Sequence, residues 1–145
     1  MKIIINNKKA LFNYQIIDKY IAGISLQGCE VKSIINAQTN LDQAFIILKK
    51  NEAFIINMYV APWKQCANKN LSTTRNRKLL LNKHEILKID LFLKRNSATV
   101  IPLNVFLSHN KIKLTIATAK RKNAHDKRQS SKENDLKREI KKFMK

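Results

Sequence analysis

The chain has 145 residues and carries 29 Lys and Arg against 10 Asp and Glu, a formal net charge of +19. A compact domain with this much uncompensated positive charge repels itself, so a polyanion such as nucleic acid is the expected partner. The length allows one domain and a tail, and a hydrophobic content of 44% is too high for a chain that is disordered throughout.

Several classes of protein are excluded by what the sequence lacks. No apolar stretch approaches the roughly 20 residues of a membrane span, so no membrane partner is expected. Gly23 and Gly28 are the two glycines, too few for a glycine-rich phosphate loop. Cys29 and Cys66 have no metal-ligand spacing around them and follow no signal peptide, so we expect reduced thiols in a cytosolic protein.

The first half of the chain predicts strands and one short helix. Residues 11–26 contain two short extended runs separated at Asp18, which fit either a bent hairpin or one kinked strand. In residues 27–37, Val31, Ile34 and Ile35 fall on one helical face. The apolar runs 41–48 and 53–61 are joined by four polar residues, as in a hairpin that ends before Pro62.

The second half begins with a polar segment at residues 65–77, which we expect to be an exposed loop. The apolar spacing over residues 79–94 predicts a helix packed on a sheet. Residues 98–106 and 111–119 form the clearest hairpin, with a turn at Ser108–Asn110, and the second arm alternates lysine with apolar residues.

A basic tail follows residue 119. Residues 120–145 contain eleven basic and four acidic residues and little that is apolar before Leu136. Leu136, Ile140, Phe143 and Met144 then lie on one stripe of a helix, which suits an intermolecular partner. We expect a domain at residues 1–119 and a tail at 120–145 that is disordered alone and folds on binding.

The elements together predict an α+β fold that is mainly β. Antiparallel strands with two interposed helices in a small basic domain fit a β-barrel of oligonucleotide-binding type. Other α+β arrangements are also compatible with this pattern.

Five sequence blocks resemble, in order, the SsrA-binding protein family of bacterial trans-translation. They are Asn7-Lys8-Lys9-Ala10 with Tyr14, the block Ala22 to Ser33, Asn40-Leu41 with Asn57-Met58 and Pro62, Arg75 to Leu81 followed by Val100 to Leu103, and His125-Asp126-Lys127-Arg128. Each block is weak alone, but their order along nearly the whole chain makes coincidence improbable.

The resemblance implies a cytoplasmic bacterial protein that is not an enzyme, needs no cofactor or metal and acts as a monomer. Members bind the tRNA-like domain of transfer-messenger RNA (tmRNA) and deliver it to stalled ribosomes, where the tail enters the decoding centre and message channel. Carried over to this chain, the RNA-binding residues are Lys8, Gly28, Glu30, Lys32, Arg75, Arg77, Lys78, Leu80 and Asn82. The residues that engage the ribosome are His125, Asp126, Lys127, Arg128, Phe143, Met144 and Lys145.

Among the departures from the family pattern, two place isoleucine where relatives have a charged residue. Ile21 stands where relatives have a glutamate implicated in RNA binding, and Ile35 stands where they usually have arginine.

Several roles remain open on the residues alone. Arg75, Arg77 and Lys78 suit phosphate contacts or a solvated basic loop. Glu30 suits either a hydrogen bond with RNA or a surface salt bridge. Tyr59 and Trp63 suit base stacking or the core.

For the protein as a whole, a small ribosomal protein or a general RNA chaperone is the alternative function. An RNA-modifying enzyme fits poorly, because the sequence has no nucleophile, carboxylate pair or cofactor loop.

Overall fold

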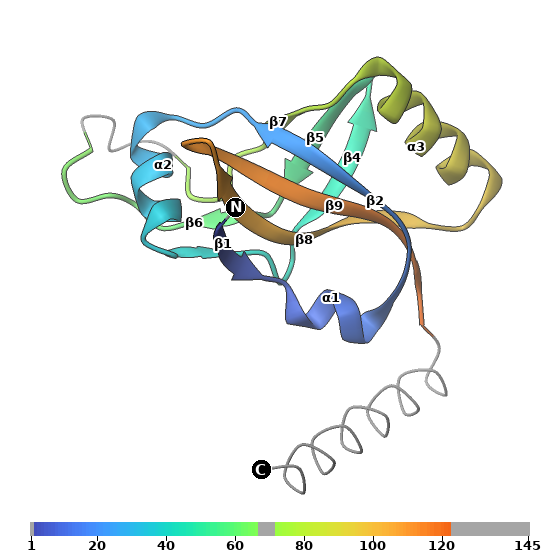
Figure 1. The fold of residues 1–145 in the computed structure, drawn as a ribbon, viewed down its shortest axis with the longest axis horizontal. Helices are drawn as coiled ribbons and strands as arrows, with labels where there is room; N and C mark the ends of the chain where they lie inside the picture. Colours follow the sequence, from blue (N-terminus) through green and yellow to red (C-terminus); the bar gives the residue numbers. More distant parts are fainter. Residues whose placement is uncertain (1, 67–71, 123–145) are drawn as a thin grey trace, which may run out of the picture.

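The computed structural model describes residues 2–66 and 72–122, which form nine strands and three helices (Figure 1). The strands are β1 (Lys2–Asn6), β2 (Tyr14–Ile24), β3 (Thr39–Asn40), β4 (Phe45–Lys49), β5 (Glu52–Ile56), β6 (Tyr59–Val60), β7 (Arg77–Leu80), β8 (Thr99–Ser108) and β9 (Lys111–Arg121). The helices are α1 (Lys8–Asn13), α2 (Gly28–Ile35) and α3 (Lys83–Arg95).

Seven of these strands form one antiparallel sheet in the order β1-β8-β4-β5-β7-β2-β9. Because β8 also pairs with β9, six strands form a closed circuit and β1 is added at β8. Closure of this kind removes sheet edges, as a barrel does. The fold is therefore consistent with the predicted barrel, and β3 and β6 form a separate two-stranded ribbon.

Both predicted hairpins form, but the second arm of the first ends at Ile56, and Tyr59–Val60 form the separate strand β6. Lys50 and Asn51 join β4 to β5, and His109 and Asn110 join β8 to β9, all four with positive φ between 50° and 61°. Two-residue turns of this conformation match the twist of the strands they connect.

Residues 14–24 form one strand, so the kinked strand is the correct alternative of the two predicted for this region. The register of β2 against β9 shifts between Ile16 and Asp18, where the sequence has its polar break. A bulge at this point bends the strand.

The first predicted helix is confirmed, but its buried face differs from the expected one. Glu30, Ser33 and Ile34 are buried in α2, whereas Ile35 is 51% exposed. The helix therefore turns an acidic side chain toward the interior, which hydrophobic periodicity does not predict.

The second predicted helix begins four residues later than expected. Residues 77–80 form β7, which pairs with β5 on one side and with β2 on the other. In β7 Leu79 is 2% exposed and Leu80 57% exposed, an alternation that marks a strand. The prediction merged a four-residue strand with the helix that follows it.

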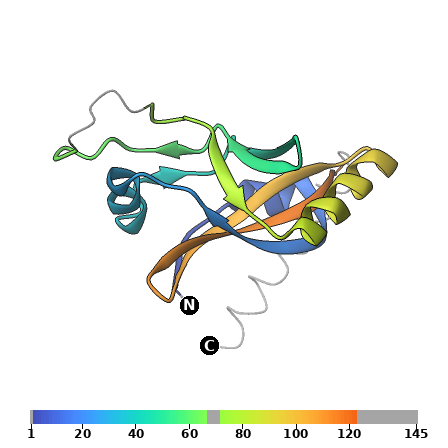
Figure 2. The same ribbon diagram turned by 90° about the horizontal axis from the view of Figure 1, so that it is seen from above.

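The main apolar core fills the space inside the sheet. Fully buried members include Ala22, Ile34, Leu41, Ile55, Met58, Leu79, Ile89, Leu114 and Ile116. A smaller cluster lies beneath α1, which the sequence did not predict; its members are Ala10, Ile101, Leu103, Ala117 and Ala119. Two orthogonal views place α2 and α3 at opposite ends of the molecule (Figures 1 and 2).

The end of the domain lies beside α1. Strand β9 continues to Arg121, two residues beyond the expected boundary, and the Lys122 backbone N–H donates to the Asn13 carbonyl at 2.8 Å. All seven predicted ribosome-engaging residues, from His125 to Lys145, lie outside the described residues. In the described ranges no helix is long and apolar enough to cross a membrane.

Candidate nucleic-acid interface

A buried carboxylate lies at the start of α2. Glu30 is in the first turn of the helix and is 3% exposed. One of its oxygens, Oε1, accepts a hydrogen bond from the Gln27 backbone N–H at 2.9 Å, which caps the helix start. Its carboxylate points away from solvent toward β7 and the segment before it.

Arg77, the first residue of β7, meets this carboxylate and is fully buried. Its Nε donates to Glu30 Oε2 at 2.6 Å, and its Nη2 also pairs with that oxygen. The remaining guanidinium contacts are with the carbonyl oxygens of Met58, Arg75 and Thr73, at 2.7, 3.2 and 3.2 Å. A guanidinium has five N–H donors, so these contacts use its full capacity.

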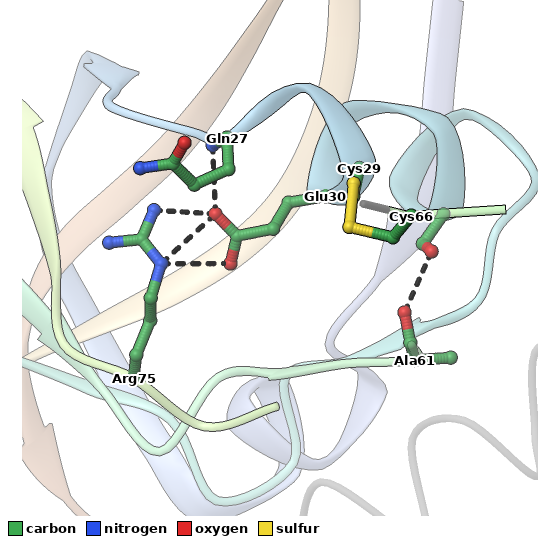
Figure 3. The surroundings of a disulfide bond; sticks show 7 residues. Gln27, Cys29, Glu30, Ala61, Cys66 and Arg75 are labelled. Carbon is green, nitrogen blue, oxygen red and sulfur yellow. Dashed lines mark hydrogen bonds and ion pairs between the residues drawn. A yellow bond between two sulfur atoms is a disulfide. The ribbon is translucent and has the colours of Figure 1, made fainter. Parts of the chain in front are cut away.

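Arg75 contacts the same carboxylate from the surface side. Its Nε lies 3.1 and 3.2 Å from the two Glu30 oxygens (Figure 3). Its Nη2 also donates to Ser25 O at 3.4 Å. The Arg75 side chain is 25% exposed. It therefore keeps part of its guanidinium toward solvent while it neutralises Glu30.

The network keeps its members charged. Burial by itself raises the pKa of Glu30, but hydrogen bonds from Arg75, the Gln27 N–H and Arg77 outweigh it and hold that pKa below its ordinary value. Burial lowers the pKa of Arg77, opposed by its contacts with Glu30. An arginine pKa starts so high that the guanidinium stays protonated at neutral pH.

These contacts change the roles expected for Glu30 and Arg77. Glu30 forms a buried ion pair, so neither an exposed acceptor for RNA nor a surface salt bridge describes it. Arg77 has no donor left for a phosphate. The sequence alone does not reveal this, because the two residues are 47 positions apart. Both residues position α2 and the segment that leads into β7.

Other predicted RNA-binding residues are exposed and lie on three elements. Gly28 and Lys32 are on α2, Leu80 ends β7, and Asn82 precedes α3. Lys78 is also exposed and pairs with Glu52 at 3.2 Å. Lys8 is on α1, which packs on β8 and β2 away from this group.

Leu80 lines a hollow to which β2, β7, β8, β9 and α2 contribute side chains. In the sheet Gly23 pairs with Leu80 on one side and with Lys113 on the other. A hollow of about 300 Å³ lies here. We call it the β2–β7 hollow; its lining includes Gly23, Ile35, Leu80, Lys111, Ile112 and Lys113.

Ile21 extends the apolar surface beyond this hollow. It is 57% exposed and, being two residues from Gly23 in β2, faces the same side of the sheet. Ile21 and Ile35, the two departures noted in the sequence, are thus both exposed apolar side chains near Leu80. Here an apolar floor meets two lysines, a combination that suits the base and phosphate groups of a nucleotide.

Lys111 and Lys113 were not among the predicted site residues. Their alternation with apolar residues in the last hairpin was visible in the sequence, but their position beside Gly23 depends on the pairing of β9 with β2. The alternating pattern was visible in the sequence, but only the sheet topology shows where the two lysines lie.

The expectation of reduced thiols is wrong for this structure. Cys29 and Cys66 form a disulfide with a Cα–Cα separation of 5.6 Å, which joins α2 to the segment after β6 (Figure 3). The sequence separation of 37 residues gave no sign that the two cysteines meet.

The two aromatic candidates differ in exposure. Tyr59 is 41% exposed, whereas Trp63 is partly buried and lines a second pocket next to the disulfide. In the described ranges, no group of His, Cys, Asp and Glu is arranged to hold a metal ion.

The fold and these surfaces define a class of protein: a basic, mainly antiparallel β protein whose exposed candidate site joins apolar and lysine side chains. Comparison with known proteins narrows the class. The SmpB protein family matches residues 4–145, and the chain belongs to that family.

Relatives agree over nearly the full length. The chain is 46% identical over 143 residues to an SsrA-binding protein of Mycoplasmoides gallisepticum, covering 99% of this chain and 100% of that one. It is 49% identical over 143 residues to the SsrA-binding protein of Mycoplasma mobile, covering 99% of each.

A solved structure is also similar. It is described as "tmRNA-SmpB: a journey to the center of the bacterial ribosome" and matches with a TM-score of 0.69 and 30% identity, covering 83% of this chain and 85% of the other.

Proposed function

We propose that this chain binds tmRNA through its tRNA-like domain and delivers it to stalled ribosomes for rescue and peptide tagging. The observation that carries the proposal is the structural match to SmpB in a tmRNA and ribosome setting, at 30% identity over 83% of the chain. The family match over residues 4–145 supports it along the whole sequence.

We assign RNA contact to the exposed candidates. Leu80 lines the β2–β7 hollow, Gly28 and Lys32 lie on α2, which contributes Val31 and Ile35 to its lining, and Asn82 is two residues after Leu80. Arg75 adds a partly exposed guanidinium. Lysines 111 and 113 supply phosphate contacts at the rim. Glu30 and Arg77 act indirectly, because they fix the segment that carries Arg75.

The protein acts by binding, without catalysing a reaction itself, as a cytoplasmic monomer. The residues after β9, from position 122 to 145, serve as a separate tail for the ribosome, with His125 to Arg128 near its start and Phe143 to Lys145 at its end. The net +5 of that tail against +14 on residues 1–121 supports two separate basic surfaces, one for each RNA.

A gel-shift titration tests this function. Purified full-length protein is titrated against cognate tmRNA, an elongator tRNA and an unrelated structured RNA of similar length, all at the same salt concentration. Phosphate attraction is independent of sequence, so specific recognition requires tighter binding to tmRNA than to the other two, by about tenfold or more. Equal affinities for all three RNAs contradict the proposal and favour a general RNA chaperone.

A further inference from the structure

The disulfide joins α2 to the connection between β6 and β7, and hydrogen bonds hold the two ends of this connection. At one end, Ala61 accepts a hydrogen bond from Ser33 Oγ at 2.7 Å and donates one to Gln38 O at 2.9 Å. At the other end, Thr73 O accepts from the Val60 backbone N–H at 2.9 Å. Between these anchors, Cys66 is bonded to Cys29 on α2 (Figure 3).

The bond also closes one wall of a pocket. A cavity of about 210 Å³ is lined by both cysteines, Glu30, Trp63 and Thr73. The indole Nε1 of Trp63 is buried there without a hydrogen-bond partner among the described residues. The Trp63 indole N–H thus gives residues 62–66 no polar tie to the described residues, whereas the disulfide ties them covalently to α2.

The link lies next to the candidate RNA contacts. Cys29 stands between Gly28 and Glu30, and Arg75 contacts Glu30 directly. Lys64, exposed on the pinned segment, adds a positive charge to the same end of the molecule. The disulfide therefore lies on the part of α2 that carries Gly28 and Glu30.

We propose that Cys29 and Cys66 act as a reversible thiol–disulfide latch, which holds residues 62–66 against α2 when closed and releases them when a dithiol reduces it, weakening RNA binding. The RNA part rests on the proposed function. Release leaves Ala61 anchored and lets residues 62–66 move, so any contact made by this segment costs ordering entropy on binding.

The chemistry is thiol–disulfide exchange. A thiolate of the dithiol attacks the Cys29 sulfur, because Cys29 is the less buried of the two residues. The Cys29–Cys66 bond breaks, a mixed disulfide forms, and the second thiol of the dithiol resolves it. The protein gains two electrons and two protons as two thiols, and the dithiol becomes a disulfide. Oxidised glutathione reverses the change and leaves as two reduced thiols.

Limited proteolysis measures the opening of the latch in the absence of RNA. Full-length protein is equilibrated with oxidised glutathione or dithiothreitol, digested briefly with trypsin, and mapped by mass spectrometry. Reduction should raise the cleavage rate after Lys64 by about fivefold or more, because cleavage follows the population of the open segment. Cleavage after Lys49, at the end of β4, is the internal control and should not change. Equal rates after Lys64 in the two states overturn the proposal.

Two further arms separate the latch from the RNA assignment. Cys66→Ser should be cleaved rapidly after Lys64 in both redox states, and its far-UV circular dichroism should match the wild type; slow cleavage in both states overturns the latch. In gel shifts, reduction should weaken tmRNA binding of the wild type about threefold or more and leave that of Cys66→Ser unchanged. Redox-dependent cleavage with unchanged tmRNA affinity overturns the RNA part of the latch. If neither redox state prefers tmRNA, the proposed function fails, while the cleavage result still decides whether the latch exists.

Discussion

At the scale of single residues, the Glu30 carboxylate is the charge that joins α2 to Arg75 and Arg77. It receives hydrogen bonds from two arginines and a backbone N–H, and one of those arginines, Arg77, is fully buried. Burying such a pair is costly, but removing one partner is worse because the other charge is left without compensation.

Replacing Glu30 with glutamine should therefore destabilise the fold strongly. We expect Glu30→Gln to lower the free energy of unfolding by about 3–5 kcal/mol, since Arg77 keeps its charge in a dry site. Urea denaturation followed by circular dichroism measures this. Glu52→Gln is the control: Glu52 pairs with Lys78 at the surface, where both side chains are 47% exposed, and should cost at most about 1 kcal/mol. Equal losses for the two variants would contradict the account.

Glu30 also makes the free energy of unfolding depend on pH in the acidic range. The folded-state pKa of Glu30 lies below its ordinary value, so its contribution is fully present above the unfolded-state pKa. It is lost as the pH falls toward the folded-state pKa. The difference in unfolding free energy between wild type and Glu30→Gln should be constant near neutral pH and should shrink below about pH 4, where an unfolded glutamate becomes protonated. A difference that grows on acidification would be the wrong sign.

At the scale of elements, β2 and β7 approach each other closely at Gly23, so a side chain at this position requires Leu80 to shift. A Cβ added to Gly23 would stand 3.2 Å from the Leu80 Cβ, whereas one added to Gly28 meets nothing within 4 Å. Gly23 therefore marks a close approach between strands, and Gly28 does not.

The two glycines should respond in opposite directions to a larger side chain. Gly23→Val should cost about 1–3 kcal/mol of stability by overpacking and displace Leu80. Gly28→Ala, in the first turn of α2, should gain about 0.4–1 kcal/mol by restricting the unfolded chain. Thermal unfolding of both variants tests this, and a stabilised Gly23→Val would show that the two strands are not in close contact there.

Elements with a clear period could be predicted from the sequence, and others could not. The last hairpin has a long alternating pattern and was found, and α2 was found from three apolar residues at helical spacing, although its buried face differs from the predicted one. Strand β7 has four residues and α1 has six, too few for a period to stand out. The hidden parts of the site are non-local: the pairing of Glu30 with Arg77 and of Cys29 with Cys66 depends on which strands lie side by side.

At the scale of the whole molecule, the residues named from the sequence separate into two kinds. Leu80, Asn82, Gly28 and Lys32 face solvent, and their exposure fits direct contact. Glu30 and Arg77 belong to the interior. The resemblance to a family predicts which positions matter for RNA binding, and the burial of each side chain shows which of them can contact RNA directly.

Two exposed leucines test whether tmRNA binding depends on the position of a surface side chain or only on its hydrophobicity. Leu80→Glu puts a negative charge in the β2–β7 hollow and should weaken tmRNA binding by about tenfold or more, through lost contact and repulsion of phosphate. Leu91→Glu on α3 is the matched control, because Leu91 is 50% exposed against 57% for Leu80. Gel shifts at one salt concentration make the comparison, and equal effects would remove the hollow from the RNA contact surface.

The net charge of +19 over 145 residues fits the two RNA-binding parts proposed above, the folded domain and the tail. The most direct test is peptide tagging in a reconstituted bacterial translation system that lacks its own SmpB and is stalled on a message without a stop codon. With cognate tmRNA and the full chain, the tagged product should appear. With residues 132–145 deleted, tmRNA should still be bound but tagging should be lost. Absence of tagging with the full chain, despite bound tmRNA, would contradict the central claim.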